Sequence, residues 1–122
     1  MKKIAIIAIF VMINLNLSVH AANTGQTSRT PLLDNKQVKV WRTVLYPSKQ
    51  QQLKMHHHAN DRVLVALDNG KIKIVNDEQQ THYLDITAGN AYFLPKDQGL
   101  HKHTDENMGK KPLKVVVIEL KT

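Results

Sequence analysis

The sequence predicts an all-β protein with a single sandwich or barrel domain. Three observations lead to this fold class. Short runs of alternating apolar and polar residues recur from residue 36 onwards, and turn-forming residues separate them at regular intervals. No apolar repeat of helical period follows residue 21. About a hundred residues remain after the N-terminal segment, which is enough for one domain with a small core.

The first 21 residues have the composition of a secretory signal peptide. Lys2 and Lys3 precede the uncharged apolar run 4–13, and Val19 and Ala21 are small residues at the two positions that a signal peptidase reads. We therefore expect cleavage after Ala21 and a periplasmic or secreted protein without a stable membrane anchor. A retained anchor is the alternative, although the run is shorter than the roughly 20 residues that span a bilayer.

The mature chain is expected to begin with an arm. Residues 22–35 start with a polar stretch that lacks large apolar side chains, so we expect a flexible arm there and the domain over residues 36–121. The sequence has no cysteine, which excludes a disulfide framework. Loss of Lys2 and Lys3 lowers the formal net charge from +7 to about +5, spread along the chain. Without a dense basic block carrying interleaved aromatic residues, nucleic-acid binding is not expected.

The first half of the domain contains three predicted strands. Alternating residues that begin at Lys36 form the first strand, and Pro47 closes it. Residues 53–58 and 62–67 form two more, one on each side of the Ala59-Asn60 pair. Their β-branched and apolar residues alternate with polar ones, which is the pattern of a half-buried strand.

The second half continues the same pattern with clear turns. Asp68-Asn69-Gly70 is a strong hairpin signal that leads into the strand 71–75. Two further alternating strands follow, and Pro95 ends the second of them. The remaining segments are the strands 81–86 and 91–94, a loop at 104–109, and a β-branched final strand at 113–120.

Two histidine clusters are the strongest functional signal. His56, His57 and His58 form one, and His101 and His103 form the other. Alternate residues of a strand point to the same face, so His56 and His58 can meet at one point while His57 faces the other way. Imidazole is the commonest metal ligand near neutral pH. A second strand must then bring His103 or His101 to that point.

These residues resemble the cupin family, and in particular small secreted single-domain cupins with a His-x-His-x-x-Asp-Arg-Val core. The resemblance covers roughly residues 40–120. The first family motif has His-x-His, a Glu four residues later and a Gly. His56, His58 and Gly70 match it here, with one extra residue before Gly70 and with Arg62 in the place of the Glu.

The second family motif has Gly, Pro, Gly, His and Asn at set spacings. It is matched, with two extra residues after the Pro, by Gly89, Pro95, Gly99, His103 and Asn107. The resemblance implies the double-stranded β-helix of the cupin jelly-roll barrel. It also implies a divalent metal ion, such as Zn, Mn, Ni or Fe, held by His56, His58 and His103. It implies no single activity.

Arg62 is the main departure from the family pattern. A guanidinium cannot ligate a cation, so three imidazoles would hold the ion and leave positions open for water. Asp61 supplies a carboxylate only if residues 59–60 form a bulge. The Arg62 fork either binds a carboxylate or phosphate of a ligand or forms a salt bridge to Asp61, Asp85 or Glu119.

Several other residues are candidates for smaller roles. His101 either replaces His103 as a ligand or contacts the bound molecule, and Tyr92 is a candidate ligand contact or pocket wall. His82 is expected at the surface. Trp41 and Tyr46 are expected to pack in the core or on a dimer face.

The sequence favours an exported cupin that binds a divalent metal and takes a small anionic molecule as its ligand. No catalytic residue is assigned, because neither a Gly-x-Ser-x-Gly motif nor a phosphate loop is present. One alternative is a metal-free module that binds a sugar or an organic acid, and another is a dimeric structural or interaction protein. We expect a homodimer, because a small core and free strand edges favour symmetric pairing.

Overall fold

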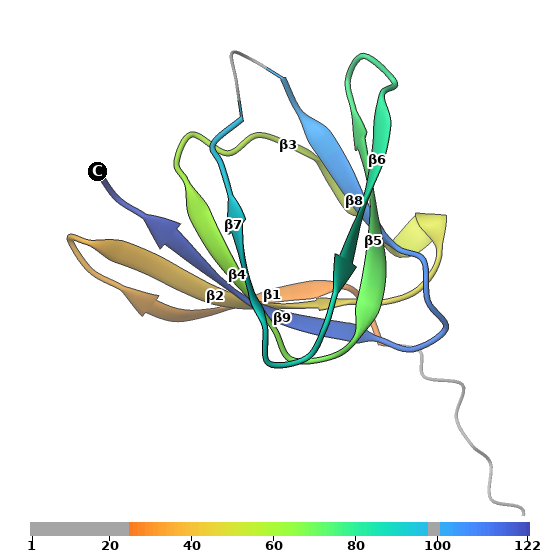
Figure 1. Cartoon of the computed structure of the whole chain (residues 1–122), viewed down its shortest axis with the longest axis horizontal. Coiled ribbons are helices and arrows are strands. Elements are labelled where there is room, and N and C mark those ends of the chain that lie inside the picture. Colours follow the sequence, from red (N-terminus) through yellow and green to blue (C-terminus); the bar gives the residue numbers. More distant parts are fainter. Residues whose placement is uncertain (1–24, 98–100) are drawn as a thin grey trace, which may run out of the picture.

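The computed structural model describes residues 25–97 and 101–122, which form two antiparallel sheets facing each other (Figure 1). One sheet has five strands in the order β1-β2-β9-β4-β7, and the other has four in the order β3-β8-β5-β6. The predicted signal peptide over residues 1–21, and Gly99 of the second motif, lie outside the described residues. Within the described ranges, no helix is long and apolar enough to cross a membrane.

The strands follow one another along the chain with short connections. Their bounds are β1 Ser28–Asp34, β2 Val38–Leu45, β3 Leu53–His56, β4 Arg62–Ala66, β5 Gly70–Asn76, β6 Thr81–Ile86, β7 Ala91–Leu94, β8 His103–Asn107 and β9 Leu113–Leu120, with a 3-10 turn η1 at Lys49–Gln51. From β2 onwards every connection except the one between β5 and β6 crosses from one sheet to the other. This crossing pattern is that of a jelly roll, and it confirms the predicted fold class.

The core lies between the two sheets. Trp41, Val117 and Leu64 are neighbours across β2, β9 and β4, and all three are buried. Ile72 of β5 and Ile86 of β6 face them from the other sheet. Residues at alternate positions of β2, β4 and β9 point inward, as expected for strands with one buried face.

Residues 28–34 form the edge strand β1 instead of belonging to the flexible arm predicted for residues 22–35. The strand pairs with β2 from Ser28 to Asp34, with a register shift between Pro31 and Leu33. All seven of its residues are exposed. The strand therefore has no buried face, and its sequence lacks the alternation of apolar and polar residues that predicts a strand. A proline is also tolerated at the edge of a sheet.

The Asp68-Asn69-Gly70 turn does not form the predicted hairpin. It connects β4 to β5, and these strands lie in different sheets. The Asp68 carboxylate accepts a hydrogen bond from the Lys114 backbone N–H (2.9 Å), and the side-chain Oδ1 of Asn69 accepts one from the Ala88 backbone N–H (2.8 Å). The polar side chains that suggested a hairpin therefore fasten the turn to other segments.

The predicted loop at 104–109 is largely strand, because β8 runs from His103 to Asn107. The residues of β8 are all polar, so the strand shows no alternation of apolar and polar residues. Asn107 is buried, and its amide nitrogen donates to the carbonyls of Leu45 and Lys111, each at 2.8 Å. The second-motif asparagine thus ties the end of β8 to the end of β2 and to the turn that leads into β9.

Candidate metal centre

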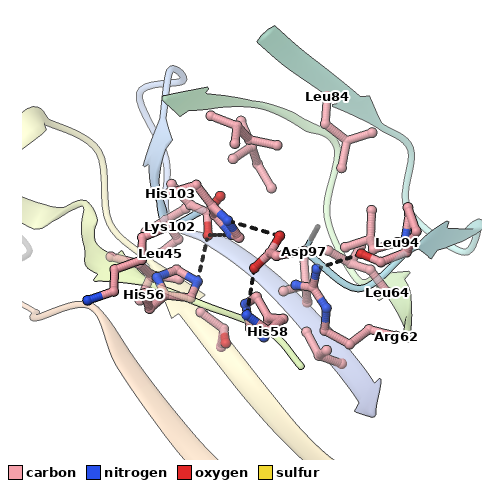
Figure 2. Close-up of a pocket in the computed structure, with 18 of the residues that line it drawn as sticks. Leu45, His56, His58, Arg62, Leu64, Leu84, Leu94, Asp97, Lys102 and His103 are labelled. Atoms are coloured by element: carbon pink, nitrogen blue, oxygen red, sulfur yellow. Dashed lines mark hydrogen bonds and ion pairs between the residues drawn. The ribbon is translucent and has the colours of Figure 1, made fainter. Parts of the chain in front are cut away.

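His56, His58 and His103 meet inside the barrel, at one end of the space between the sheets (Figure 2). His56 is the last residue of β3 and His103 is the first residue of β8, and the two are direct partners across the sheet. One ligand atom from each of the three imidazoles lies within 4.8 Å of the others. Ring centroids are 4.5 to 5.3 Å apart.

His58 reaches the cluster by a different route from the one predicted. Because β3 ends at His56, strand alternation does not continue to His58. Instead its backbone N–H donates to the Asp97 carboxylate (2.5 Å) and its carbonyl accepts from the Asp97 N–H (2.9 Å). This double contact turns the buried His58 ring inward and leaves His57 exposed.

The tautomer of His56 and the lowered pKa values of His58 and His103 favour binding of a cation. His56 Nδ1 lies 2.6 Å from the Lys54 carbonyl, so it carries the proton and leaves the lone pair on Nε2. That Nε2 is buried and has no hydrogen-bond partner. Burial, assisted by Arg62 and the other two histidines, lowers the pKa of His58 to about 2, and burial also lowers the pKa of His103. A neutral imidazole is the form that ligates metal, so these residues fit a metal ion.

Two carboxylates beside the cluster were missed in the sequence. Asp105 Oδ2 lies 3.4 Å from His56 Nε2 and 3.8 Å from His103 Nε2, and burial raises the pKa of Asp105. Asp97 Oδ1 lies 3.4 Å from His103 Nδ1. Asp105 follows His103 by two residues, so strand alternation could have found it once β8 was recognised. Asp97 follows β7 in an irregular segment and left no such signal.

Arg62 points into the same space but takes none of the three predicted acidic partners. It is only 8% exposed, its Nη2 donates to the Pro95 carbonyl (3.4 Å), and its Nε has no partner. In residues 25–97 and 101–122, no carboxylate lies within ion-pairing distance of it. Burial lowers the pKa of Arg62 from its ordinary value. The site therefore contains a buried guanidinium that no carboxylate of the described residues contacts directly, while Asp97, Asp105 and Glu119 act on it from beyond ion-pairing distance.

The three acids proposed as partners of Arg62 are engaged elsewhere. Asp61 accepts a hydrogen bond from the Lys96 N–H (2.8 Å), so it does not supply a metal ligand through a bulge. Asp85 pairs with Lys71 at 3.7 Å on the outside of the four-stranded sheet. Glu119 accepts from the Asn60 amide at 3.1 Å.

His101 and Tyr92 stand apart from the three histidines. His101 lies at the exposed rim of the cavity, 3.0 Å from Asp77, and this hydrogen bond raises the pKa of His101. It is therefore placed for ligand contact and does not replace His103. Tyr92 packs against the core, accepts a hydrogen bond from the Thr87 N–H (2.8 Å), and is not among the described residues that line the cavity. Ligand contact by Tyr92 stays a prediction.

The cavity around the cluster has a volume of about 370 Å³, within the range of small-molecule sites. Its deep wall is formed by core residues such as Leu45, Leu64 and Ile72. Its lining also includes four cationic side chains and two carboxylates: Arg29, Arg62, Lys96, Lys102, Asp97 and Asp105. Arg29 of β1 also stacks on the Trp41 ring at 4.4 Å. The cavity thus has a positive balance of charged side chains and an apolar floor.

A jelly roll with histidines converging inside it defines a cupin, and known structures agree. A cupin domain from Bordetella pertussis Tohama I has 24% identity and a TM-score of 0.67, covering 80% of this chain and 95% of that one. An RmlC-like cupin family protein from Methanocaldococcus jannaschii has 17% identity and a TM-score of 0.60, covering 81% and 84%. Both similarities establish the fold.

The family itself is given by a sequence model. Residues 18–122 match the family described as mannose-6-phosphate isomerase C-terminal, and the chain belongs to this family. The predicted resemblance to small cupins is therefore confirmed. No curated protein matches the chain.

Proposed function

We propose that this protein is an exported cupin that binds a divalent metal ion through His56, His58 and His103 and holds a small anionic molecule against it with Arg62. The observation that carries the proposal is the meeting of three imidazoles beside a buried guanidinium that has no carboxylate partner among the described residues. Burial of an unpaired charge is costly. A ligand anion would compensate that cost.

Nitrogen donors favour zinc, nickel and iron, and a nearby carboxylate also suits manganese. When bound, such an ion supplies a Lewis acid that polarises a ligand oxygen. The residues of the chain do the rest of the binding. The Arg62 fork matches a planar or tetrahedral oxyanion, and the apolar floor receives a carbon skeleton.

The ligand class follows from the charges and walls of the cavity. Four cations against two carboxylates give the cavity a positive balance even before a metal binds. The family description names an isomerase of a sugar phosphate, and a phosphate is a group that Arg62 could hold. The deep wall is formed mostly by leucine, isoleucine and valine side chains, with Thr43 as a buried hydroxyl. We therefore favour an organic anion with an apolar portion.

Metal titration tests the first part of the proposal. Zn²⁺, Mn²⁺, Ni²⁺ or Fe²⁺ should raise the unfolding temperature of the wild type, because binding to the folded state alone stabilises it. The His56→Ala/His103→Ala variant should lose this shift. His57→Ala, which changes an exposed histidine that does not line the cavity, is the control and should keep it. Equal shifts in all three proteins would contradict the metal site and favour the metal-free binding module.

Calorimetry tests the anion. Butyrate and phosphate should bind the metal-loaded wild type and should bind the Arg62→Met variant at least tenfold more weakly. Unchanged affinity would exclude Arg62 from the ligand site.

The export proposal rests on the basic residues, the apolar run and the Val19-x-Ala21 site alone. Intact-mass measurement of protein from the cell envelope should give a chain that starts at Ala22. Recovery of only the full-length chain from the cytosol would contradict it.

A further inference from the structure

The two carboxylates beside the histidines occupy different positions. Asp97 uses one oxygen to hold the His58 backbone N–H, and its other oxygen faces His103 Nδ1. Asp105 Oδ2 instead faces the Nε2 atoms of both His56 and His103. Asp97 thus contacts the His58 backbone and the Nδ1 side of His103. Asp105 lies on the other side, where the Nε2 atoms of His56 and His103 converge.

The positions of the imidazole protons show which nitrogen atoms can bind a cation. His56 Nδ1 donates to the Lys54 carbonyl, and His103 Nδ1 faces the Asp97 carboxylate, an acceptor. Both rings are therefore directed to carry their protons on Nδ1 and their lone pairs on Nε2. A carboxylate oxygen is also an electron-pair donor. Three donors then point at one another in a buried space, an arrangement that a cation stabilises.

We propose that Asp105 is the fourth protein ligand of the metal, so that the carboxylate absent at position 62 is supplied from β8, two residues after His103. This inference rests on the proposed metal site. In a tetrahedral zinc site with bonds of about 2.1 Å, ligand atoms are about 3.4 Å apart. The distances of 3.4 and 3.8 Å from Asp105 Oδ2 to the Nε2 atoms of His56 and His103 are close to that spacing, whereas Asp105 lies more than 4 Å from the His58 nitrogens.

The assignment explains how Arg62 coexists with a metal. A carboxylate ligand offsets one of the two positive charges of a divalent ion. Asp105 also lies on β8, in the sheet opposite β4, which begins at Arg62, and the two opposite charges act on each other across the cavity. The negative charge of Asp105 therefore reduces the repulsion between the Arg62 guanidinium and the metal ion in one cavity. Three neutral imidazoles alone would not reduce it.

The test compares metal affinities in the mature protein by calorimetry with Mn²⁺ and Ni²⁺. Manganese prefers oxygen donors and nickel accepts imidazole readily. The Asp105→Asn variant should lose about 100-fold in Mn²⁺ affinity and about tenfold or less in Ni²⁺ affinity. The Asp105→His variant should keep tight Ni²⁺ binding and lose Mn²⁺ binding. Asp97→Asn is the matched control, and it should weaken both metals by a similar factor.

Each outcome bears on a different proposal. If Asp105→Asn binds Mn²⁺ as the wild type does, or if the ratio of Mn²⁺ to Ni²⁺ affinity is the same in wild type and both Asp105 variants, Asp105 is not a ligand. If His56→Ala/His103→Ala also binds both metals unchanged, the proposed function itself fails. Thermal unfolding in EDTA identifies a variant that does not fold, and the other Asp105 variant then decides the question.

Discussion

Arg62 occupies a position that favours ligand binding over stability. Its guanidinium is removed from water without an ionic partner among the described residues, and its Nε has no hydrogen bond. Replacement of a buried charge by an apolar side chain of similar length is often neutral or stabilising. The same residue is the one we propose to hold the ligand anion.

We predict that Arg62→Met raises the free energy of unfolding of the metal-free protein by about 1 kcal/mol or more. Chemical denaturation in EDTA would measure it. Lys39→Met, which changes an exposed cation on β2, is the control and should shift the value by less than about 0.5 kcal/mol. A clear loss of stability in Arg62→Met would mean that the guanidinium has a structural partner in the fold.

Position 70 requires a glycine because the Leu113 side chain leaves no room for a Cβ, and not because of the backbone conformation. A Cβ at this position would lie 2.7 Å from a Leu113 methyl carbon, and Leu113 is only 1% exposed. Gly89 is the opposite case, because its φ is +86° and nothing lies within 4 Å of a Cβ there. Close packing therefore requires a glycine at position 70, whereas the backbone conformation favours a glycine at position 89.

We predict that Gly70→Ala lowers the free energy of unfolding by about 1–3 kcal/mol through overpacking. Leu113→Val removes the methyl positions that the new Cβ meets, so the double variant should be more stable than the sum of the two single changes implies. Gly89→Ala should cost about 1 kcal/mol and should show no such coupling to Leu113→Val. Strict additivity at Gly70 would reject the packing explanation.

At the scale of elements, a side chain from the C-terminal tail holds the turn between β1 and β2. Asp34 ends β1, and its carboxylate accepts a hydrogen bond from the Lys121 ammonium, which also donates to the Asn35 carbonyl (2.7 Å). The hydrogen bond from Lys121 lowers the pKa of Asp34. The C-terminal tail thereby fastens the turn between β1 and β2.

This contact predicts a pH dependence. Because the folded-state pKa of Asp34 is lowered, its contribution to stability is fully present above the ordinary aspartate pKa of about 4 and is lost as the pH falls through the lower folded value. The stability difference between wild type and Asp34→Asn should be constant above about pH 5 and shrink below about pH 4. NMR titration should show the Asp34 pKa rising in Lys121→Ala and rising less in Lys39→Ala. An unchanged pKa in Lys121→Ala would contradict the contact.

At the scale of the molecule, the two outward faces differ in character. Across the five-stranded sheet, the outward row Leu33, Val40, Ile118, Val63 and Phe93 is wholly apolar, and Phe93 is 62% exposed. The outward face of the four-stranded sheet instead carries charged neighbours such as Lys71 with Asp85 and Lys73 with Glu106. The five strands contain 4 to 8 residues each. At about 3.4 Å per residue and about 4.8 Å between strands, they cover roughly 500 Å², comparable to one side of a small interface.

We propose that a second copy of the chain covers the apolar face. The row is centred on β9, so a two-fold axis there would place Leu33 of one copy near Phe93 of the other. Light scattering at tens of micromolar should give a dimer mass for the wild type and a monomer mass for Val63→Lys. Val75→Lys makes the same change on the other sheet and should remain dimeric. A monomeric wild type would contradict this assembly.

Much of the fold could be predicted from local patterns. The strands β2, β4, β6, β7 and β9 have one buried face, so alternation revealed them, and the two histidine motifs indicated the family. The strands that were missed or shortened are the exposed β1 and the polar β8. Neither separates apolar from polar residues between its two faces, and this separation is what sequence periodicity detects.

The sequence by itself determined the all-β class, the cupin resemblance and the three histidines that the fold brings together. Only the tertiary structure decided that Asp97 and Asp105 flank them, that Arg62 lies buried with no described carboxylate within ion-pairing distance, and that Tyr92 packs against the core. The reason is physical. Strand period fixes which residues of one strand share a face, but neighbours across strands depend on sheet order and register, which long-range packing sets.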